Sequence, residues 1–150
     1  MLVDQKTVVS ASVDRVWEFL TDIPSVSRCM PGVEEFQAVD GETFEGTVKV
    51  RVGPISVRLQ GQISVVERDR DNLRSRVEIK ATEKRISSTV SARTTMELRS
   101  IDEAHTELHV VTEASILGKL GEFGQAVMRR KADQMLEEFV ANMSRTITAG

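Results

Sequence analysis

The chain has 150 residues, which suits one domain with one hydrophobic core, and its 40% apolar and 29% charged residues are typical of a globular protein. A single tryptophan and no tyrosine argue against a nucleic-acid-binding surface made of aromatic side chains, and a net charge of −3 is too small to imply a polyionic partner. One cysteine cannot form an internal disulfide, and with only two histidines beside it we expect no metal site.

The first part of the chain contains signals for one strand and two short helices. Residues 3–10 alternate between apolar and polar side chains, which favours a strand. Ser12 is a suitable N-cap for a helix over residues 13–21. Pro24 fits the first turn of a second helix, and this helix should end before Pro31 because the residue preceding a proline avoids the α region.

From Val33 to residue 112 the apolar residues recur with a period of two. Turns are predicted at Gly53-Pro54, at residues 69–72 and at residues 83–85. One-sided alternation of this kind is typical of antiparallel strands with one buried face and one solvated face. The predicted inner set is Phe44, Val48, Val50, Val52, Ile55, Val57, Leu59, Ile63, Val65, Leu73, Val77, Ile79, Ile86, Val90, Ala92, Met96, Leu98, Leu108 and Val110.

From Lys119 the period becomes helical, and it continues for about eight turns. We expect one long helix that covers the inner face of the sheet. Glycine costs about 1 kcal/mol relative to alanine inside a helix, so Gly118, Gly121 and Gly124 are unusual. These glycines and the methionines favour an interior that is not completely filled. The apolar positions are Leu120, Phe123, Val127, Met128, Met135, Leu136, Phe139, Val140, Met143 and Ile147.

Several segments together carry a family resemblance. They are Val16-Trp17 with Leu20 and Asp22, Cys29-Met30-Pro31-Gly32, residues 44–50, residues 52–55, Gly61 and residues 118–124. In this order they resemble the carbon monoxide dehydrogenase G-subunit family, within the START and Bet v 1-like (SRPBCC) superfamily. The resemblance implies an α+β helix-grip fold over residues 1–150. In that fold a curved antiparallel sheet of six to seven strands wraps a long C-terminal helix, and two short helices follow the first strand.

The resemblance also implies a function. Such a protein would be a non-catalytic accessory protein that holds a lipid or quinone between sheet and helix and associates with a molybdenum hydroxylase of the carbon monoxide dehydrogenase type, without a cofactor of its own. The alternatives are a polyketide cyclase or hydrolase on the same fold, and a protein-binding module with a filled core. The expected ligand-binding residues are Trp17, Cys29, Met30, Phe44, Val48, Leu59, Ile63, Val77, Val90, Met96, Leu108, Val110, Phe123, Val127, Met128, Lys131 and Met135.

Two polar candidates for the site have two interpretations each. Cys29 is either a ligand contact at the cavity mouth or a small buried apolar residue. Lys131 either anchors a carboxylate or quinone oxygen, or extends its ammonium group to the rim. His105 and His109 are expected to point outward beside Glu107, so we predict no catalytic residues.

The outward face of the predicted sheet is basic, although the chain is acidic overall. It is either a docking face for anionic lipids or an acidic protein, or simply a solvated surface. Its cations are Lys49, Arg51, Arg58, Arg74, Arg76, Lys80, Arg93 and Arg99.

The location expected from the sequence is the cytoplasm. Residues 1–6 lack an apolar run, and no segment approaches the roughly 20 apolar residues of a membrane span. Many members of the resembled family carry a C-terminal extension that is thought to reach the membrane, whereas this sequence stops at Gly150 without an apolar tail. We therefore expect at most weak electrostatic contact with the inner face of the membrane.

Overall fold

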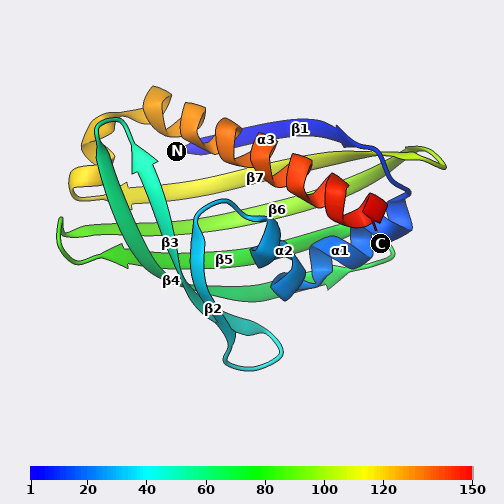
Figure 1. The fold of residues 1–150 in the computed structure, drawn as a ribbon, viewed down its shortest axis with the longest axis horizontal. Helices are drawn as coiled ribbons and strands as arrows, with labels where there is room; N and C mark the ends of the chain where they lie inside the picture. The colour runs from blue at the N-terminus through cyan, green and yellow to red at the C-terminus, as the bar shows by residue number, and fades with distance from the viewer. Residues whose placement is uncertain (150) are drawn as a thin grey trace.

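Seven antiparallel strands form one sheet that curves around the C-terminal helix in the computed structural model, which describes residues 1–149 (Figure 1). The order across the sheet is β1-β7-β6-β5-β4-β3-β2. The predicted fold class, with two short helices after the first strand, is thus confirmed. The elements are β1 (Leu2–Val9), α1 (Val13–Thr21), α2 (Ile23–Cys29), β2 (Val33–Ala38), β3 (Thr43–Val52), β4 (Ile55–Asp69), β5 (Arg74–Glu83), β6 (Ser88–Asp102), β7 (His105–Leu117), the 3₁₀ helix η1 (Lys119–Phe123) and α3 (Gln125–Ala149).

The two short helices begin and end where their sequence signals predict. Ser12 is the N-cap of α1, and its Oγ accepts a hydrogen bond from the backbone N–H of Arg15 at 3.4 Å. Trp17 lies on the buried face of α1. In α2, Pro24 occupies the first turn, and the helix ends before Pro31.

The strand register places the predicted inner residues that lie in strands on the concave face, whereas Leu73 and Ile86, also predicted there, lie in turns. Val48 lies opposite Leu59 on β3 and β4, and Ile63 lies opposite Ile79 on β4 and β5. Because side chains alternate between the two faces of a strand, cross-strand partners point to the same side. The alternation in the sequence therefore correctly predicted which face carries the core.

The prediction of one continuous helix from Lys119 is wrong. The backbone φ angle is +82° at Gly118 and +85° at Gly124, and these two residues flank η1. Such angles are open to glycine and strained for other residues. Gly124 therefore separates the 3₁₀ turn from α3, which begins at Gln125.

Buried apolar side chains form two separate clusters near opposite ends of the molecule. The first cluster joins α1, α2 and the C-terminal half of α3 to the sheet, and it contains Val9, Ala11, Val16, Trp17, Leu20, Cys29, Leu98, Leu108, Val110, Phe139, Met143 and Ile147. The second cluster lies beside η1 and contains Val52, Val57 and Leu120, with Val50, Ile55, Leu59, Ile86, Val90, Ile116, Phe123, Val127 and Met128 packed against it. The middle of the concave face belongs to neither cluster.

Candidate ligand-binding site between the sheet and α3

Small side chains, most of them half-buried, form much of the concave face between the two clusters, with Val77 and Ala81 buried among them. Ala92 lies opposite Ala114, and Thr94 lies opposite Thr112 on β6 and β7. Ile63 lies on β4 in the same row across the sheet, two strands away from Ala92, and it is also only half-buried. Protein interiors are normally packed to crystal-like density. Short side chains in the centre of the sheet fill less of the space beneath α3 than larger residues would.

The helix above this region is held mainly at its ends and edges. The backbone of α3 comes closest to α2, β1, α1, β3 and η1. Over the central strands it presents the half-buried side chains of Met128, Ala132 and Met135. Flexible methionines can adapt to guests of different shape, so this roof suits a variable apolar ligand.

A groove follows the seam between α3 and β3. Its larger part has a volume of about 530 Å³ and runs from Gly53 along Val127 and Arg130. A narrower part of about 60 Å³ continues beside Gly32 and Met135. The groove is open to solvent and lies along the edge of α3 that faces β3.

Lys131 lines both parts of this groove. Its side chain is half-buried, and it forms none of the ion pairs found within residues 1–149. A lysine at such a rim can lay its methylene groups on apolar neighbours and keep its ammonium group in water. The same position allows the ammonium group to meet a polar group at the end of a bound molecule.

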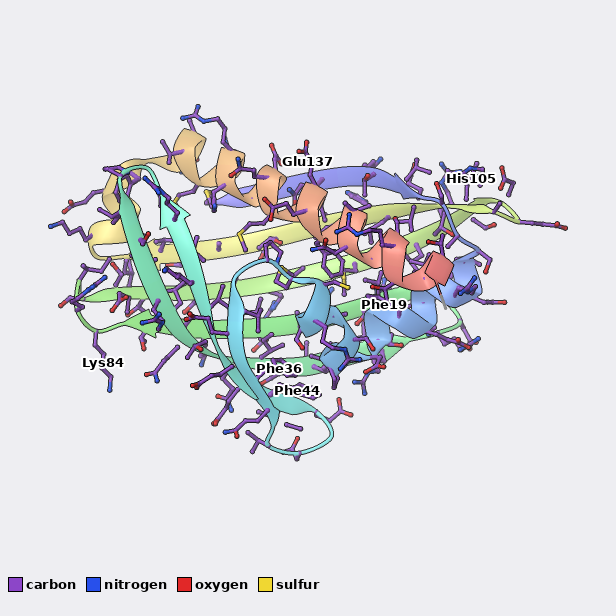
Figure 2. All side chains as sticks on the ribbon, in the orientation of Figure 1. Phe19, Phe36, Phe44, Lys84, His105 and Glu137 are labelled. Atoms are coloured by element: carbon purple, nitrogen blue, oxygen red, sulfur yellow. The ribbon has the colours of Figure 1, made fainter. Side chains whose placement is uncertain are left out.

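The residues predicted to bind ligand fall into three groups. Trp17, Cys29, Leu108 and Val110 are buried in the first cluster, with Met30 and Met96 packed against it. Leu59, Val90, Phe123, Val127 and Met128 pack against the second cluster. Val48, Ile63, Val77, Lys131 and Met135 lie between the clusters, and Phe44 is buried beside Phe36, with their stacked rings 5.5 Å apart (Figure 2).

The structure gives Cys29 a local structural role. Its Sγ lies 3.6 Å from Oγ1 of Thr146, and its backbone carbonyl accepts a hydrogen bond from Nδ2 of Asn142 at 2.9 Å. Both partners are on α3. Cys29 thus joins α2 to the C-terminal half of α3, deep in the first cluster.

Sequence reasoning missed three polar features of the concave side. Oγ1 of Thr112 lies 3.1 Å from Oγ1 of Thr94, so two hydroxyl groups pair beneath α3. Gln5 on β1 donates from Nε2 to Oδ1 of Asp133 on α3 at 2.9 Å. Glu83, predicted to lie in a turn, is the last residue of β5 and is buried. The strand register reveals the threonine pair, but the sequence alone does not provide that register.

Glu83 is held by main-chain groups. The backbone N–H groups of Arg58 and Arg85 donate to its carboxylate at 2.8 Å and 3.0 Å, and these bonds lower the pKa of Glu83 below its usual value. At this point β4 has separated from β5, since their pairing starts at Gln60 and Thr82. The carboxylate therefore takes the place of a missing strand partner.

Ion pairs partly neutralise the outward face of the sheet. Arg58 pairs with Glu34, Arg93 with Glu78, Arg99 with Glu107, and Arg74 with Glu67. The bond from Arg58 lowers the pKa of Glu34. His109 points to this face, as predicted, and its Nε2 lies 2.7 Å from Oδ1 of Asp4. The face is therefore less basic than its list of cations suggests.

Residues 1–149 contain neither a metal-binding cluster nor a helix that could span a bilayer. No group of three or more His, Cys, Asp or Glu side chains in that range is arranged to hold a metal ion. None of the helices there is both long and apolar enough to cross a membrane.

Comparisons with known proteins identify the fold and the family of this chain. A conserved protein from Geobacillus kaustophilus superposes with a TM-score of 0.90 at 16% identity, over 99% of this chain and 96% of that one. The Zhui aromatase/cyclase of a Streptomyces species gives 0.67 at 14% identity, covering 99% and 93%. A START superfamily protein from Mycobacterium smegmatis gives 0.69 at 11% identity, covering 99% and 97%. At these identities the structures show a shared fold.

No curated protein matches the sequence. The family model for the carbon monoxide dehydrogenase G-subunit (CoxG) matches residues 6–148, which is nearly the whole chain. The chain therefore belongs to the carbon monoxide dehydrogenase G-subunit (CoxG) family.

Proposed function

We propose that this protein is a non-catalytic accessory protein that holds an apolar molecule of the lipid or quinone class between α3 and the concave face of the sheet. The observation that carries the proposal is the band of mostly half-buried side chains that separates the two core clusters. A folded domain gains little by leaving such a band open to water, because burying apolar surface contributes about 25 cal/mol per Å². An apolar guest would supply that burial.

The composition of the band suits a flexible guest. Met128 and Met135 line one side and small residues such as Ala92 and Ala114 line the other. Ligand sites are usually mostly apolar, with a few polar groups that orient the ligand. Here the paired hydroxyls of Thr94 and Thr112 and the ammonium group of Lys131 would play that part.

We propose that the protein acts beside a molybdenum hydroxylase of the carbon monoxide dehydrogenase type. The support is family membership, because the family is described as part of carbon monoxide dehydrogenase. A molecule of the quinone class would suit such a partner, since a redox enzyme needs an electron acceptor.

The enzyme alternative has less support. General acid/base chemistry needs a titratable side chain within hydrogen-bond reach of a bound substrate. The hydroxyls of Thr94 and Thr112 are paired with each other. Lys131 lies at the rim of the groove, and the carboxylate of Glu83 is held by backbone N–H groups. We therefore assign the interior to binding.

The test has two steps. Protein purified from cells is extracted with organic solvent and the extract is analysed by mass spectrometry, with an unrelated protein of similar size prepared in parallel. Ligand-free protein is then offered a long-chain quinone and a phospholipid, and uptake is measured after gel filtration. We expect a co-purified apolar molecule or stoichiometric uptake. Neither guest nor uptake would reject the carrier role in favour of a filled-core module.

A further inference from the structure

A second groove, called the outer groove below, lies on the face of the sheet that points away from α3. It has a volume of about 800 Å³ and extends from β2 across β3 and β4 to β5. Strand β4 pairs with β3 through residues 55–64 and with β5 through residues 60–69, so the sheet turns where the two pairings overlap. Figure 1 shows the change of direction between β3 and β5. Gln60, Gly61 and Gln62 line the outer groove at this turn.

Polar side chains line the outer groove in two parallel rows. Side chains alternate between the two faces of a strand, so Glu45 and Thr47 on β3 point outward on either side of the glycine at position 46. Cross-strand pairing gives their partners the same orientation. One row contains Glu45, Gln62 and Lys80, and the other contains Thr47, Gln60 and Thr82.

Thr47 presents an unused hydroxyl group to the outer groove. The residue is only 9% exposed, yet its side chain forms no hydrogen bond with another group of residues 1–149. Every polar side-chain atom that is sealed from solvent in that range has a partner. The hydroxyl of Thr47 must therefore open into the outer groove. Nearly buried polar groups normally have hydrogen-bond partners, so this hydroxyl lacks one that an occupant could supply.

The charged neighbours of Thr47 are also free. Elsewhere on the outward face, Arg93 pairs with Glu78 and Arg99 with Glu107, each at 3.0 Å. Glu45 and Lys80 take part in none of the ion pairs found within residues 1–149. The outer groove thus keeps a carboxylate at its β3 side and an ammonium group at its β5 side available to an occupant.

We propose that the outer groove binds an extended peptide segment with a basic and an acidic residue three positions apart. Glu45 and Lys80 lie in one row two strands apart, which is about 9–10 Å. In a polyproline II chain, residues three apart lie on the same side at a spacing of about 9 Å, and the backbone has no internal hydrogen bonds. The two charges of such a peptide would meet Glu45 and Lys80.

The uncharged groups of the outer groove suit the backbone of the same peptide. Glutamine amides and threonine hydroxyls both donate and accept hydrogen bonds, as N–H and C=O groups require. Thr47, Gln60, Gln62 and Thr82 supply such groups between the two charges. They can serve a chain that runs in either direction, because each of them offers both kinds of bond.

Other occupants fit the outer groove less well. Its lining contains Glu34, Glu35 and Glu45 but a single cation, Lys80, so the phosphates of a nucleic acid would be repelled. A neutral oligosaccharide could use the amides and hydroxyls, but it would leave both free charges unmatched. The proposal is independent of the carrier role, since the outer groove and α3 lie on opposite faces of the sheet.

The test is fluorescence anisotropy with a labelled, amidated peptide of six residues that has arginine second and glutamate fifth among alanine and proline. We expect saturable binding, and binding weaker by about tenfold when glutamine replaces both charged residues. Thr47→Val should weaken binding a few-fold, by about the worth of one hydrogen bond. Its urea midpoint should not fall, because the hydroxyl has no partner in the free protein. Unlabelled peptide should displace the probe at lower concentration than maltotetraose.

A charge exchange gives the decisive comparison. Glu45→Lys should weaken binding by on the order of tenfold, and Glu45→Lys/Lys80→Glu should restore it, because the peptide can then lie in the opposite direction. The matched control is Glu97→Lys, an equal charge change at an exposed position outside the outer groove, which should bind like the parent. Circular dichroism confirms that each variant is folded.

Four results would overturn the proposal. They are a parent protein without saturable peptide binding, equal losses in the Glu45 and Glu97 variants, a charge-exchanged variant as weak as the single Glu45 variant, and displacement of the peptide more readily by maltotetraose than by unlabelled peptide.

Discussion

Val127 lies where the second cluster meets the groove between α3 and β3. It packs against the second cluster and also lines the groove between α3 and β3, so one side of its side chain faces packed atoms and the other faces an opening. A larger side chain at this position can therefore extend into the region where we place the ligand.

We expect Val127→Trp to change the denaturant midpoint little and to reduce uptake of a long-chain quinone strongly. The matched control is Val57→Trp, because Val57 is only 1% exposed in the same cluster. Overpacking there should cost about 1–3 kcal/mol or more. Urea titration and uptake measurements on both variants test this. Equal destabilisation by the two substitutions, with quinone uptake by the Val127 variant unchanged, would show that the groove does not lead into a ligand space.

Glu83 links stability to pH. Its pKa is lowered in the folded state by the backbone N–H groups of Arg58 and Arg85. The ionised carboxylate therefore stabilises the fold above about pH 4.3, the ordinary value for glutamate, and this contribution is lost as the pH falls through the lowered folded pKa.

We expect Glu83→Gln to unfold at lower urea concentration than the parent near pH 7, and we expect the difference to shrink below about pH 4. Urea midpoints measured across this pH range give the comparison. Glu103→Gln, at an exposed position in the β6–β7 turn, is the control and should show a small difference at every pH. A Glu83 effect independent of pH would contradict the assigned cause.

At the scale of elements, the junction between the sheet and α3 depends on two glycines with positive φ angles. A Cβ atom at Gly118 would collide with the backbone carbonyl oxygen of Ser87, whereas a Cβ at Gly124 would meet no atom within 4 Å. Gly118 is therefore required by both backbone angle and space, and Gly124 by backbone angle alone.

We expect Gly124→Ala to lower the free energy of unfolding by about 1–3 kcal/mol, the usual cost of a strained backbone angle, and Gly118→Ala to lower it by more. Gly41→Ala is the control, because Gly41 has neither a positive φ angle nor a neighbour within 4 Å of the added atom. Urea unfolding of the three variants provides the ranking. A Gly118 variant no less stable than the Gly124 variant would show that the turn moves away from Ser87 at little cost.

At the scale of the whole molecule, the two core clusters give α3 two unlike halves. Phe139, Met143 and Ile147 are buried in the C-terminal half, while residues 125–134 include no buried side chain. Local opening is easiest where few apolar groups are buried. The half of α3 above the groove should therefore open more readily than the half that closes the first cluster.

Hydrogen exchange measures this difference. We expect the amides of residues 129–134 to exchange faster than those of residues 139–147 in the ligand-free protein, and to slow when a quinone is added. Exchange that is uniform along α3 in both states would argue against a separate, ligand-sensitive half.

The sequence predicted the parts of this molecule that depend on local pattern. The alternation from Val33 onwards identified the concave face, and Ser12 identified the start of α1, because burial on one side and capping both leave a local signature. The 3₁₀ turn was missed because Leu120 and Phe123 keep a spacing that either kind of helix can produce. Backbone angles at the flanking glycines leave no mark in the residue pattern.

Features that depend on which strands pair could not be found in the same way. The small residues Ala92 and Ala114 become neighbours only through the register of β6 and β7. The division of the core into two clusters depends on such pairings of small residues, which the sequence does not show. The ion pair between Arg58 and Glu34 also depends on tertiary placement, so the outward face looked more basic in sequence than it is in the fold.

The position of Cys29 makes its thiol a natural probe for the opening of the structure between α2 and α3. It is the only cysteine in the chain, and it is 4% exposed beneath the C-terminal half of α3. A thiol-modifying reagent can reach its sulfur only after α2 and α3 separate. The labelling rate in excess reagent therefore measures the rate at which these two helices separate. No engineered probe is needed.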